Sequence, residues 1–308
     1  MTYDDAVGQA PVDTDRPGRI PMAAERMNVR VIPRLDIKGP NLVKGIHLEG
    51  LRVLGRPEYF ARHYCENGAD ELMYQDVVAS LFERNSLHEI ISRTAREIFI
   101  PLAVGGGLRS IQDVRGVLRA GADKVSLNTA AIRRPELIRE AALSFGSSTI
   151  VISIEAIMEE DGRYLAYVDN GREHTGLDVL EWAQRAEHLG AGEILLTSVD
   201  REGTGTGFDL ELIRMVSRGV SIPVIAHGGA GSAEDCFDAF DRGSADAISV
   251  ASILHYDCIQ ASDARDHDDA EGNVVFLKSG QVFKKIHPVK LPDIKALLTE
   301  KGVPCRHA

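Results

Sequence analysis

The sequence of 308 residues lacks any apolar stretch that approaches a membrane-spanning helix, which needs about 20 such residues. Its first 25 residues mix Asp, Pro, Gly and Arg, and they contain no apolar core of the kind that a secretory signal requires. We therefore expect no membrane as a partner, and we predict a flexible polar tail over residues 1–27. A cytoplasmic location is the expectation that follows.

Cysteines are few as well, and the 35 basic residues are outnumbered by 46 acidic ones. The four cysteines (Cys65, Cys236, Cys258 and Cys305) have no Cys-x-x-Cys spacing, which is typical of reduced structural thiols. The acidic run Asp263–Glu271 lacks the spacing of a calcium loop, so we predict a solvated loop and expect neither metal nor cofactor. The net charge of −11 argues against nucleic acid as a partner but leaves a phosphorylated substrate open, because anion sites are local.

The middle half of the chain contains an internal repeat. Two segments return after 122 positions, from 68 to 190 and from 106 to 228, and a third returns with one additional residue. The pairs are Gly68–Glu71 with Gly190–Glu193, Gly106–Ser110 with Gly228–Ser232, and Gly121–Asp123 with Ser244–Asp246. Distant matches at one offset fix the order and spacing of the elements between them, so the pattern indicates two copies of a unit of roughly 120 residues.

Short β-rich runs alternate with amphipathic helical patterns along the chain. The predicted strands are Val31–Asp36, Glu71–Asp76, Pro101–Val104, Lys124–Leu127, Thr149–Ile154, Glu193–Thr197, Pro223–Ala226 and Asp246–Val250. The predicted helices are Pro57–Asn67, Leu87–Glu97, Ile111–Ala120, Pro135–Phe145, Val179–Leu189, Leu210–Ser217 and Ala233–Arg242. With the half-length repeat, this alternation predicts one (β/α)8 TIM barrel over residues 28–308. A doubly wound open sheet is the alternative, but it predicts no such repeat.

Three segments are longer than a minimal strand–helix unit requires. Lys38–Gly55 carries four glycines after the first strand, which is typical of a mobile lid. Val168–Gly176 is polar and is expected to form a small hairpin after the fifth strand. Tyr256–His287 interrupts the expected last helix and is predicted to be an insertion, with a hairpin over Val274–Ile286.

The C-terminal ends of the predicted strands, which line the active site in such barrels, are rich in glycine and polar residues. Two sets stand at repeat-related positions: Gly106, Gly107, Asn128 and Thr129 in the first half, and Gly228, Gly229, Ala251 and Ser252 in the second. Glycines let backbone N–H groups approach an anion, and helix N-termini favour it. One glycine cluster alone would more often be a tight turn, but two related clusters predict a substrate with a phosphate at each end.

Two carboxylates end strands that face each other across an eight-stranded barrel. Asp36 ends the first strand and Glu155 ends the fifth. Opposed carboxylates suit general acid–base catalysis on a substrate held between them. The alternative is that each caps a loop or pairs with a neighbour such as Lys38 or Arg34. His227 directly precedes the second glycine pair, where it is expected to contact the substrate.

Four alternating charges mark the other end of the barrel, where strands begin. They are Arg30, Glu71, Lys124 and Glu193. The arrangement suits either a structural belt of ion pairs or a gate and docking surface, and periodicity leaves both open.

Six segments share a likeness to one family: Leu35–Lys38, Leu42–Gly45, Val104–Gly107, Gly121–Ser126, Asn128–Ala131 and Glu193–Thr204. Together they resemble the cyclase subunits of imidazole glycerol phosphate synthase, a family of histidine biosynthesis. The likeness extends over about Asn28–Tyr256 and resumes at Leu291–Arg306. The sister isomerase family shares the barrel but is less similar at Asn128-Thr129 and around Thr197–Gly203.

The resemblance implies a lyase that accepts ammonia through the barrel core from a glutaminase subunit, with which it forms a heterodimer. It implies that Asp36 is the acid, that Lys44 lies on a closing lid, and that Arg30, Glu71, Lys124 and Glu193 form an ammonia gate. It further implies that Asp123 couples to the glutaminase. The substrate-binding residues implied beside the two predicted phosphate sets are Thr197, Glu202 and Gly203.

The sequence departs from the family pattern near the reacting centre. Glu155 replaces an aspartate base, Arg34 and His227 replace small residues, and Glu202 replaces an aspartate. The leading hypothesis is the cyclase–lyase reaction, with Asp36 as general acid and Glu155 as general base. The alternatives are an amidating paralogue that acts on another acceptor, such as a nucleotide-linked sugar in surface polysaccharide synthesis, and a catalytically weak barrel that binds a phosphorylated ligand.

Overall fold

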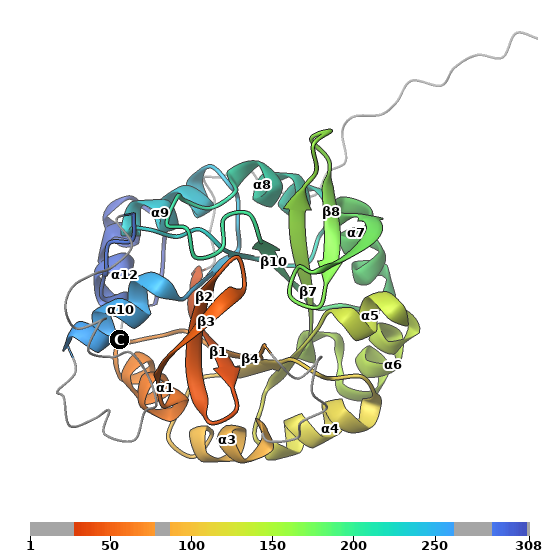
Figure 1. Cartoon of the computed structure of the whole chain (residues 1–308), viewed down its shortest axis with the longest axis horizontal. Coiled ribbons are helices and arrows are strands. Elements are labelled where there is room, and N and C mark those ends of the chain that lie inside the picture. The colour runs from red at the N-terminus through yellow and green to blue at the C-terminus, as the bar shows by residue number, and fades with distance from the viewer. Residues whose placement is uncertain (1–27, 78–86, 262–284, 307–308) are drawn as a thin grey trace, which may run out of the picture.

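Eight parallel strands close into a barrel, which confirms the predicted fold class (Figure 1). The structure, a computed structural model, describes residues 28–77, 87–261 and 285–306. The barrel strands are β1 (Arg30–Lys38), β4 (Leu72–Asp76), β5 (Leu102–Gly105), β6 (Lys124–Leu127), β7 (Ile150–Met158), β10 (Glu193–Ser198), β11 (Val224–His227) and β12 (Ala247–Val250). Pairing of β10 with β7 and of β12 with β1 completes the ring, so neither half of the repeat has an open edge.

Helices form an outer layer around the strands (Figure 1). They are α1 (Pro57–Glu66), α3 (Leu87–Thr94), α4 (Ile111–Ala120), α5 (Thr129–Arg133), α6 (Glu136–Phe145), the 3-10 turn η1 (Ser147–Thr149), α7 (Val179–Leu189), α8 (Leu210–Gly219), α9 (Ala233–Asp241), α10 (Ser252–Ala261) and α12 (Leu291–Glu300). The repeat extends to their caps, because the Ser110 and Ser232 hydroxyls accept N–H bonds at the starts of α4 and α9. Of the helices in these ranges, none could span a membrane.

Two antiparallel hairpins extend β1 and β7 beyond the barrel. They consist of β2 (Asn41–Ile46) with β3 (Glu49–Gly55) and of β8 (Tyr164–Val168) with β9 (Glu173–Asp178). The segment Lys38–Gly55, predicted as a loop, is therefore a hairpin in which Leu42 and Val43 are buried, and its role as a mobile lid stays a prediction. The second hairpin confirms the one predicted at Val168–Gly176 and is longer than predicted.

The interior of the barrel is built in layers, because alternate residues of each strand point inward. The strand starts carry the four predicted charges. Above them lies an apolar layer of Ile32, Met73, Ala103, Val151, Leu195, Ile225 and Ala247. The next inward positions, nearer the strand ends, are buried and polar: Arg34, Ser126, Ser153, Thr197, His227 and Ser249. The interior is thus polar again at the end of the barrel where the predicted site lies. We call this end of the barrel the mouth.

The predicted N-terminal tail and most of the predicted insertion lie outside the described residues. At the start of that insertion α10 continues through Tyr256 to Ala261, so this part is helical. The acidic loop at Asp263–Glu271 and nearly all of the hairpin predicted at Val274–Ile286 fall in the part that is not described. Both stay predictions.

Candidate active site

The two predicted carboxylates lie at the mouth on opposite strands of the barrel. Asp36 is on β1 and Glu155 is on β7, with three strands between them on the side through β4, β5 and β6. Both are buried, with 3% and 7% of their surfaces exposed. Their surroundings differ, and this difference determines what each can do chemically.

Asp36 is held as an anion by two cations. Its Oδ1 accepts a hydrogen bond of 2.8 Å from Nε of Arg34, whose side chain is equally buried. Burial by itself would raise the pKa of Asp36, but the charges of Arg34 and Lys44 outweigh it and lower that pKa below its ordinary value. Arg34, one of the residues that depart from the family pattern near the reacting centre, is therefore paired rather than left as an isolated buried charge.

Within the described part of the chain Glu155 forms no ion pair. Its Oε2 accepts a 2.8 Å hydrogen bond from the backbone N–H of Gly171, in the turn between β8 and β9. Burial raises the pKa of Glu155 to about 7, and the lowering effects of the Gly171 bond, the Arg34 charge and the Asn128 amide do not offset it. At neutral pH this carboxyl can therefore either give or take a proton.

Lys44 lies on β2 and reaches the mouth as an ordered, buried side chain. It forms an ion pair with Glu202, which follows β10, and the second oxygen of Glu202 accepts the N–H of Leu48 at 2.9 Å. A Cβ on Gly203 would lie 2.7 Å from the carbonyl oxygen of Gly45, so glycine is required for this close approach. The predicted residues Lys44, Glu202 and Gly203 are thus brought together, and they fasten the first hairpin to the second half of the barrel.

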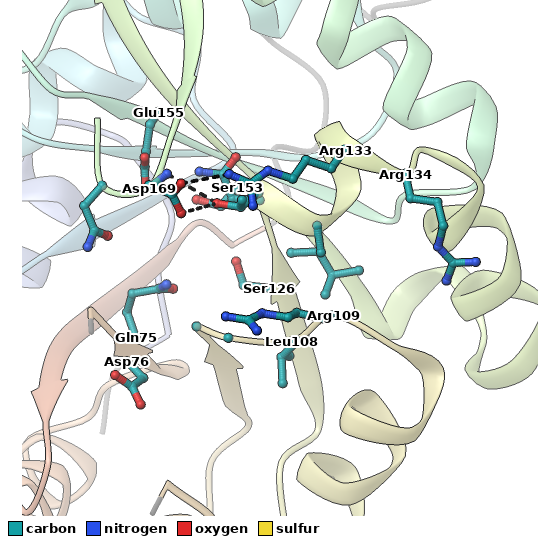
Figure 2. A pocket seen from close by; sticks show the side chains of 17 residues that line it. Gln75, Asp76, Leu108, Arg109, Ser126, Arg133, Arg134, Ser153, Glu155 and Asp169 are labelled. Atoms are coloured by element: carbon teal, nitrogen blue, oxygen red, sulfur yellow. Dashed lines mark hydrogen bonds and ion pairs between the residues drawn. The ribbon is translucent and has the colours of Figure 1, made fainter. Parts of the chain in front are cut away.

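A cavity of about 290 Å³ opens at the first predicted phosphate set (Figure 2). Gly106 and Gly107 line it with positive φ angles of 102° and 67°, and a Cβ on Gly106 would lie 2.3 Å from the carbonyl oxygen of Asp76. Asn128 and Thr129 line it from the start of α5. All four residues of the first set therefore share one cavity, which also contains Glu155.

Sequence reasoning missed several residues of this cavity. Arg109, Arg133, Arg134, Ser126 and Asp169 line it as well. The repeat could have pointed to the three arginines, because the residues at the related positions of the second half carry no positive charge. These residues are Gly231, Tyr256 and Asp257. The first set is thus the more cationic of the two.

The second predicted set is buried under other segments. Gly228 and Gly229 have φ angles of 93° and 109°, and added Cβ atoms would lie 2.5 Å and 2.2 Å from carbonyl oxygens of Ser198 and Gly207. Ala251 and Ser252, at the start of α10, are buried as well. The glycine turn predicted from the repeat is therefore present in both halves.

His227 and Thr197 point into the barrel below that turn. His227 Nδ1 lies 2.9 Å from the carbonyl oxygen of Ser249, and burial together with the Arg34 charge lowers the pKa of His227 to about 3. The imidazole is therefore neutral at physiological pH. Among the described residues neither His227 Nε2 nor Thr197 Oγ1 has a hydrogen-bond partner, so both are available to a polar ligand.

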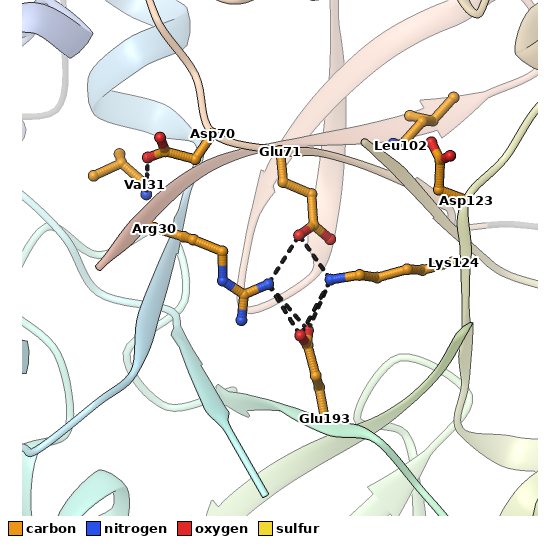
Figure 3. A network of polar contacts seen from close by, with 8 residues as sticks. All are labelled: Arg30, Val31, Asp70, Glu71, Leu102, Asp123, Lys124 and Glu193. Carbon is orange, nitrogen blue, oxygen red and sulfur yellow. Dashed lines mark hydrogen bonds and ion pairs between the residues drawn. The ribbon is translucent and has the colours of Figure 1, made fainter. Parts of the chain in front are cut away.

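The four charges at the opposite end form a closed ring (Figure 3). Glu71 Oε2 lies 2.9 Å from both Arg30 Nη1 and Lys124 Nζ, and Glu193 Oε1 lies 3.1 Å from the same two atoms. The structure confirms that the four charges form a ring of ion pairs, whereas the role of this ring as a gate stays a prediction. Beside it Asp123 accepts the N–H of Leu102 at 2.9 Å, so this carboxylate also fixes the start of β5.

No group of side chains within the described ranges has the arrangement of a metal site. The four cysteines are unpaired, and three of them are buried.

Fold and mouth together define the class: a (β/α)8 barrel with a duplicated half, whose mouth has two opposed carboxylates between two glycine turns. A sequence model of the family described as "Histidine biosynthesis protein" matches residues 30–260. The chain belongs to this family and, within it, to the group of HisF subunits of imidazole glycerol phosphate synthase.

Three HisF relatives illustrate the similarity. The subunit from Legionella pneumophila is 60% identical over 208 residues, which cover 68% of this chain and 98% of that protein. The subunit from Thermobifida fusca is 50% identical over 249 residues, covering 79% and 97%. The subunit from Alkaliphilus metalliredigens is 48% identical over 227 residues, covering 74% and 90%. The name given to these relatives makes each of them one subunit of a larger enzyme.

Proposed function

We propose that this chain catalyses the ammonia-dependent cyclase–lyase step of histidine biosynthesis that makes imidazole glycerol phosphate. The observation that carries the proposal is the mouth, where Asp36 and Glu155 face each other between two repeat-related glycine turns. A substrate with a phosphate at each end would span the two turns and place its reacting centre between the carboxylates. HisF relatives at 47–60% identity support the same function.

The two carboxylates supply the proton transfers. The resemblance assigns the acid to Asp36 and the base to Glu155. The Arg34 and Lys44 charges hold Asp36 as a carboxylate, so it can donate only after it has first accepted a proton. Glu155, with a pKa near neutrality, is the better matched group for giving and taking a proton in one cycle. We therefore assign Glu155 as the main proton-transfer group and Asp36 as its ionised counterpart.

The partner in this proposal is a glutaminase subunit that docks where the strands begin and delivers ammonia through the charged ring. The support is an exposed aromatic at the same end of the barrel: Phe99, in the connection between α3 and β5, is 93% exposed and lines a hollow of about 380 Å³ with Asp123, the neighbour of the ring residue Lys124. Large apolar side chains so fully exposed are typical of interface anchors. Phe99→Ala should weaken association with the glutaminase, whereas Met158→Ala, an exposed apolar residue near the mouth, should not.

The relatives favour this function over the two alternatives raised by the sequence, an amidating enzyme for a nucleotide-linked sugar and a weakly catalytic binding barrel. The test is complementation of a histidine auxotroph that lacks the cyclase. The chain should restore growth, and the Glu155→Gln variant should not. Failure of the expressed, folded chain to restore growth with any glutaminase subunit or with added ammonium would contradict the proposal. A cytoplasmic location stays a prediction.

A further inference from the structure

The turn between β8 and β9 lies over the cavity at the first glycine set. Its residues Asp169, Asn170 and Gly171 have consecutive positive φ angles of 52°, 61° and 74°. Aspartate, asparagine and glycine are the residues that adopt this conformation most readily. We call Asp169–Gly171 the mouth turn. Because the local sequence suits its backbone, the turn can hold its side chains over the cavity in a fixed arrangement.

Asp169 places an anion on the groups that line the first site. Its Oδ2 lies 3.0 Å from Nη2 of Arg133, and its Oδ1 lies 3.4 Å from the hydroxyl of Thr129 (Figure 2). The same hydroxyl accepts the backbone N–H of Asp169 at 3.3 Å. A carboxylate of the protein itself therefore interacts with the Thr129 hydroxyl and the Arg133 guanidinium, the two groups that a substrate phosphate would require.

The mouth turn also holds Glu155. Two residues after Asp169, the N–H of Gly171 donates to Glu155 Oε2 at 2.8 Å. Between them Asn170 donates to the carbonyl oxygen of Val77 at 2.6 Å, which fastens the turn to the end of β4. One short segment thus connects the first anion site to the carboxyl that we assign to proton transfer.

The cavity has a second, independent feature that suits an anion with several oxygens. Ser126 is 3% exposed, lines the cavity from β6, and its hydroxyl has no hydrogen-bond partner among the described residues. A phosphate brings about 1.5 to 2 negative charges and several acceptor oxygens. It could satisfy Ser126, but it would repel the carboxylate of Asp169 at close range.

We propose that Asp169 is an internal anion that competes with the substrate phosphate for Thr129 and Arg133, and that its displacement moves the mouth turn away from Glu155. The inference rests on the proposed function in taking the first glycine set as a phosphate site. Arrival of the phosphate then removes the N–H donor from the Glu155 carboxylate and adds negative charge nearby, which favours protonation of Glu155. The other groups that act on this carboxyl are Arg34 on β1, the amide of Asn128 and the charge of Asp169 itself, which raises the pKa of Glu155 and which the arriving phosphate replaces with a larger negative charge. Asp169 is therefore a positioning residue, acting through the turn.

The binding test uses the full chain and inorganic phosphate, titrated by calorimetry and fitted with two sites. Asp169→Asn keeps a residue that tolerates positive φ and removes the charge, so one of the two sites should bind phosphate roughly tenfold more tightly. Glu173→Gln is the matched control, because Glu173 also pairs with Arg133, at 2.8 Å. Among the described residues Glu173 makes no hydrogen bond to Thr129. It should change the affinity less than about twofold. Equal effects of the two variants, or no effect of Asp169→Asn, would overturn the proposal.

The coupling test needs no variant. In an NMR titration of the unmodified chain with inorganic phosphate, the Gly171 amide proton should shift upfield in step with occupancy of the tighter site, since it loses a charged acceptor. A Gly171 signal that stays in place while phosphate saturates both sites would refute the coupling. Neither measurement depends on turnover, so a chain that fails as a cyclase but shows both effects would contradict the proposed function and leave this inference standing.

Discussion

The turns of the two hairpins at the mouth begin with the same backbone conformation, and the hairpins bring charges of opposite sign to the barrel. The first turn contains His47 and Leu48, with φ angles of 51° and 61°. The second contains Asp169 and Asn170, each 122 positions further along the chain, with φ angles of 52° and 61°. The His47 side chain bonds to the carbonyl oxygen of Val199 in the second half, and the Asn170 side chain bonds to that of Val77 in the first. Each hairpin therefore contacts the opposite half of the barrel, through valines that are also 122 positions apart.

The charges that the hairpins bring are not repeated. The first hairpin places the cation Lys44 against Glu202, and the second places the anion Asp169 against Arg133. The carboxylates below the hairpins also have different partners. Asp36 is paired with the cation Arg34, whereas Glu155 accepts a backbone N–H. Acid–base catalysis requires two groups whose pKa values are pushed apart, so a duplicated scaffold becomes useful at the points where its symmetry is broken.

The largest effect is expected from removing either carboxylate. Asp36→Asn and Glu155→Gln should each lower kcat for the ammonium-dependent reaction by about 10²- to 10⁴-fold, the usual contribution of a positioned acid or base. The pH profile should separate the two residues. In Glu155→Asp the inflection near pH 7 should move to lower pH, because the ordinary pKa of an aspartate, 3.8, lies below the 4.5 of a glutamate. Retention of full activity by either neutral variant would remove that residue from the catalytic pair.

Stability should respond to the same two variants with opposite signs. Asp36→Asn leaves Arg34 buried without its partner and should destabilise the chain by about 3–5 kcal/mol. Glu155 keeps its proton up to about pH 7 in the folded state, whereas its ordinary pKa is 4.5, so its contribution to stability falls as pH rises between these values. The loss amounts to roughly 3 kcal/mol and is then constant above pH 7.

Chemical denaturation between pH 4 and pH 8 measures this difference. The stability of Glu155→Gln relative to the unmodified chain should increase through that interval, because glutamine does not titrate. A flat difference would show that the buried carboxyl does not take up a proton in the folded state.

The sequence predicted the parts of the molecule that follow from periodicity. Strand–helix alternation and the repeat gave the barrel, the glycine turns, and the opposition of Asp36 to Glu155. The charged ring was also predictable, since its members begin strands. The hairpin at Lys38–Gly55 was missed because its four glycines resemble those of a loop, although Gly45, Gly50 and Gly55 lie in its strands.

The sequence held no such signal for the contacts that the second hairpin makes with distant segments. Nothing in the local pattern around Asp169 indicates that its carboxylate meets Arg133, or that Gly171 two residues later reaches Glu155. The pairing of Arg34 with Asp36 was raised as an alternative to catalysis, and the structure shows this ion pair, whereas the catalytic role of Asp36 stays a prediction. What decided these contacts is the position of the second hairpin over the mouth, which is a property of the whole fold.

A smaller effect is expected at the charged ring, of which only the two glutamates are repeated between the halves. Arg30 joins Glu71 of the first half to Glu193 of the second. Arg30→Ala should reduce glutamine-dependent turnover by about tenfold while leaving turnover with free ammonium near its original rate, since ammonium can enter at the mouth. Both rates are measured on the complex with the glutaminase subunit. An equal loss in the two assays would support a structural belt of ion pairs and contradict the gate.

The smallest effect tests whether the two hairpin turns are interchangeable. His47 holds a positive φ in the first turn, where the second has residues that tolerate that conformation better. His47→Asn should stabilise the chain by about 0.5 kcal/mol, because asparagine relieves backbone strain and its Nδ2 occupies nearly the position from which His47 Nδ1 reaches Val199. His47→Ala, which loses the hydrogen bond, should instead destabilise by about 1 kcal/mol in the same denaturation experiment. If the asparagine variant were as unstable as the alanine variant, the first turn would depend on the imidazole ring itself, and the two turns would share a backbone without sharing the interactions that maintain it.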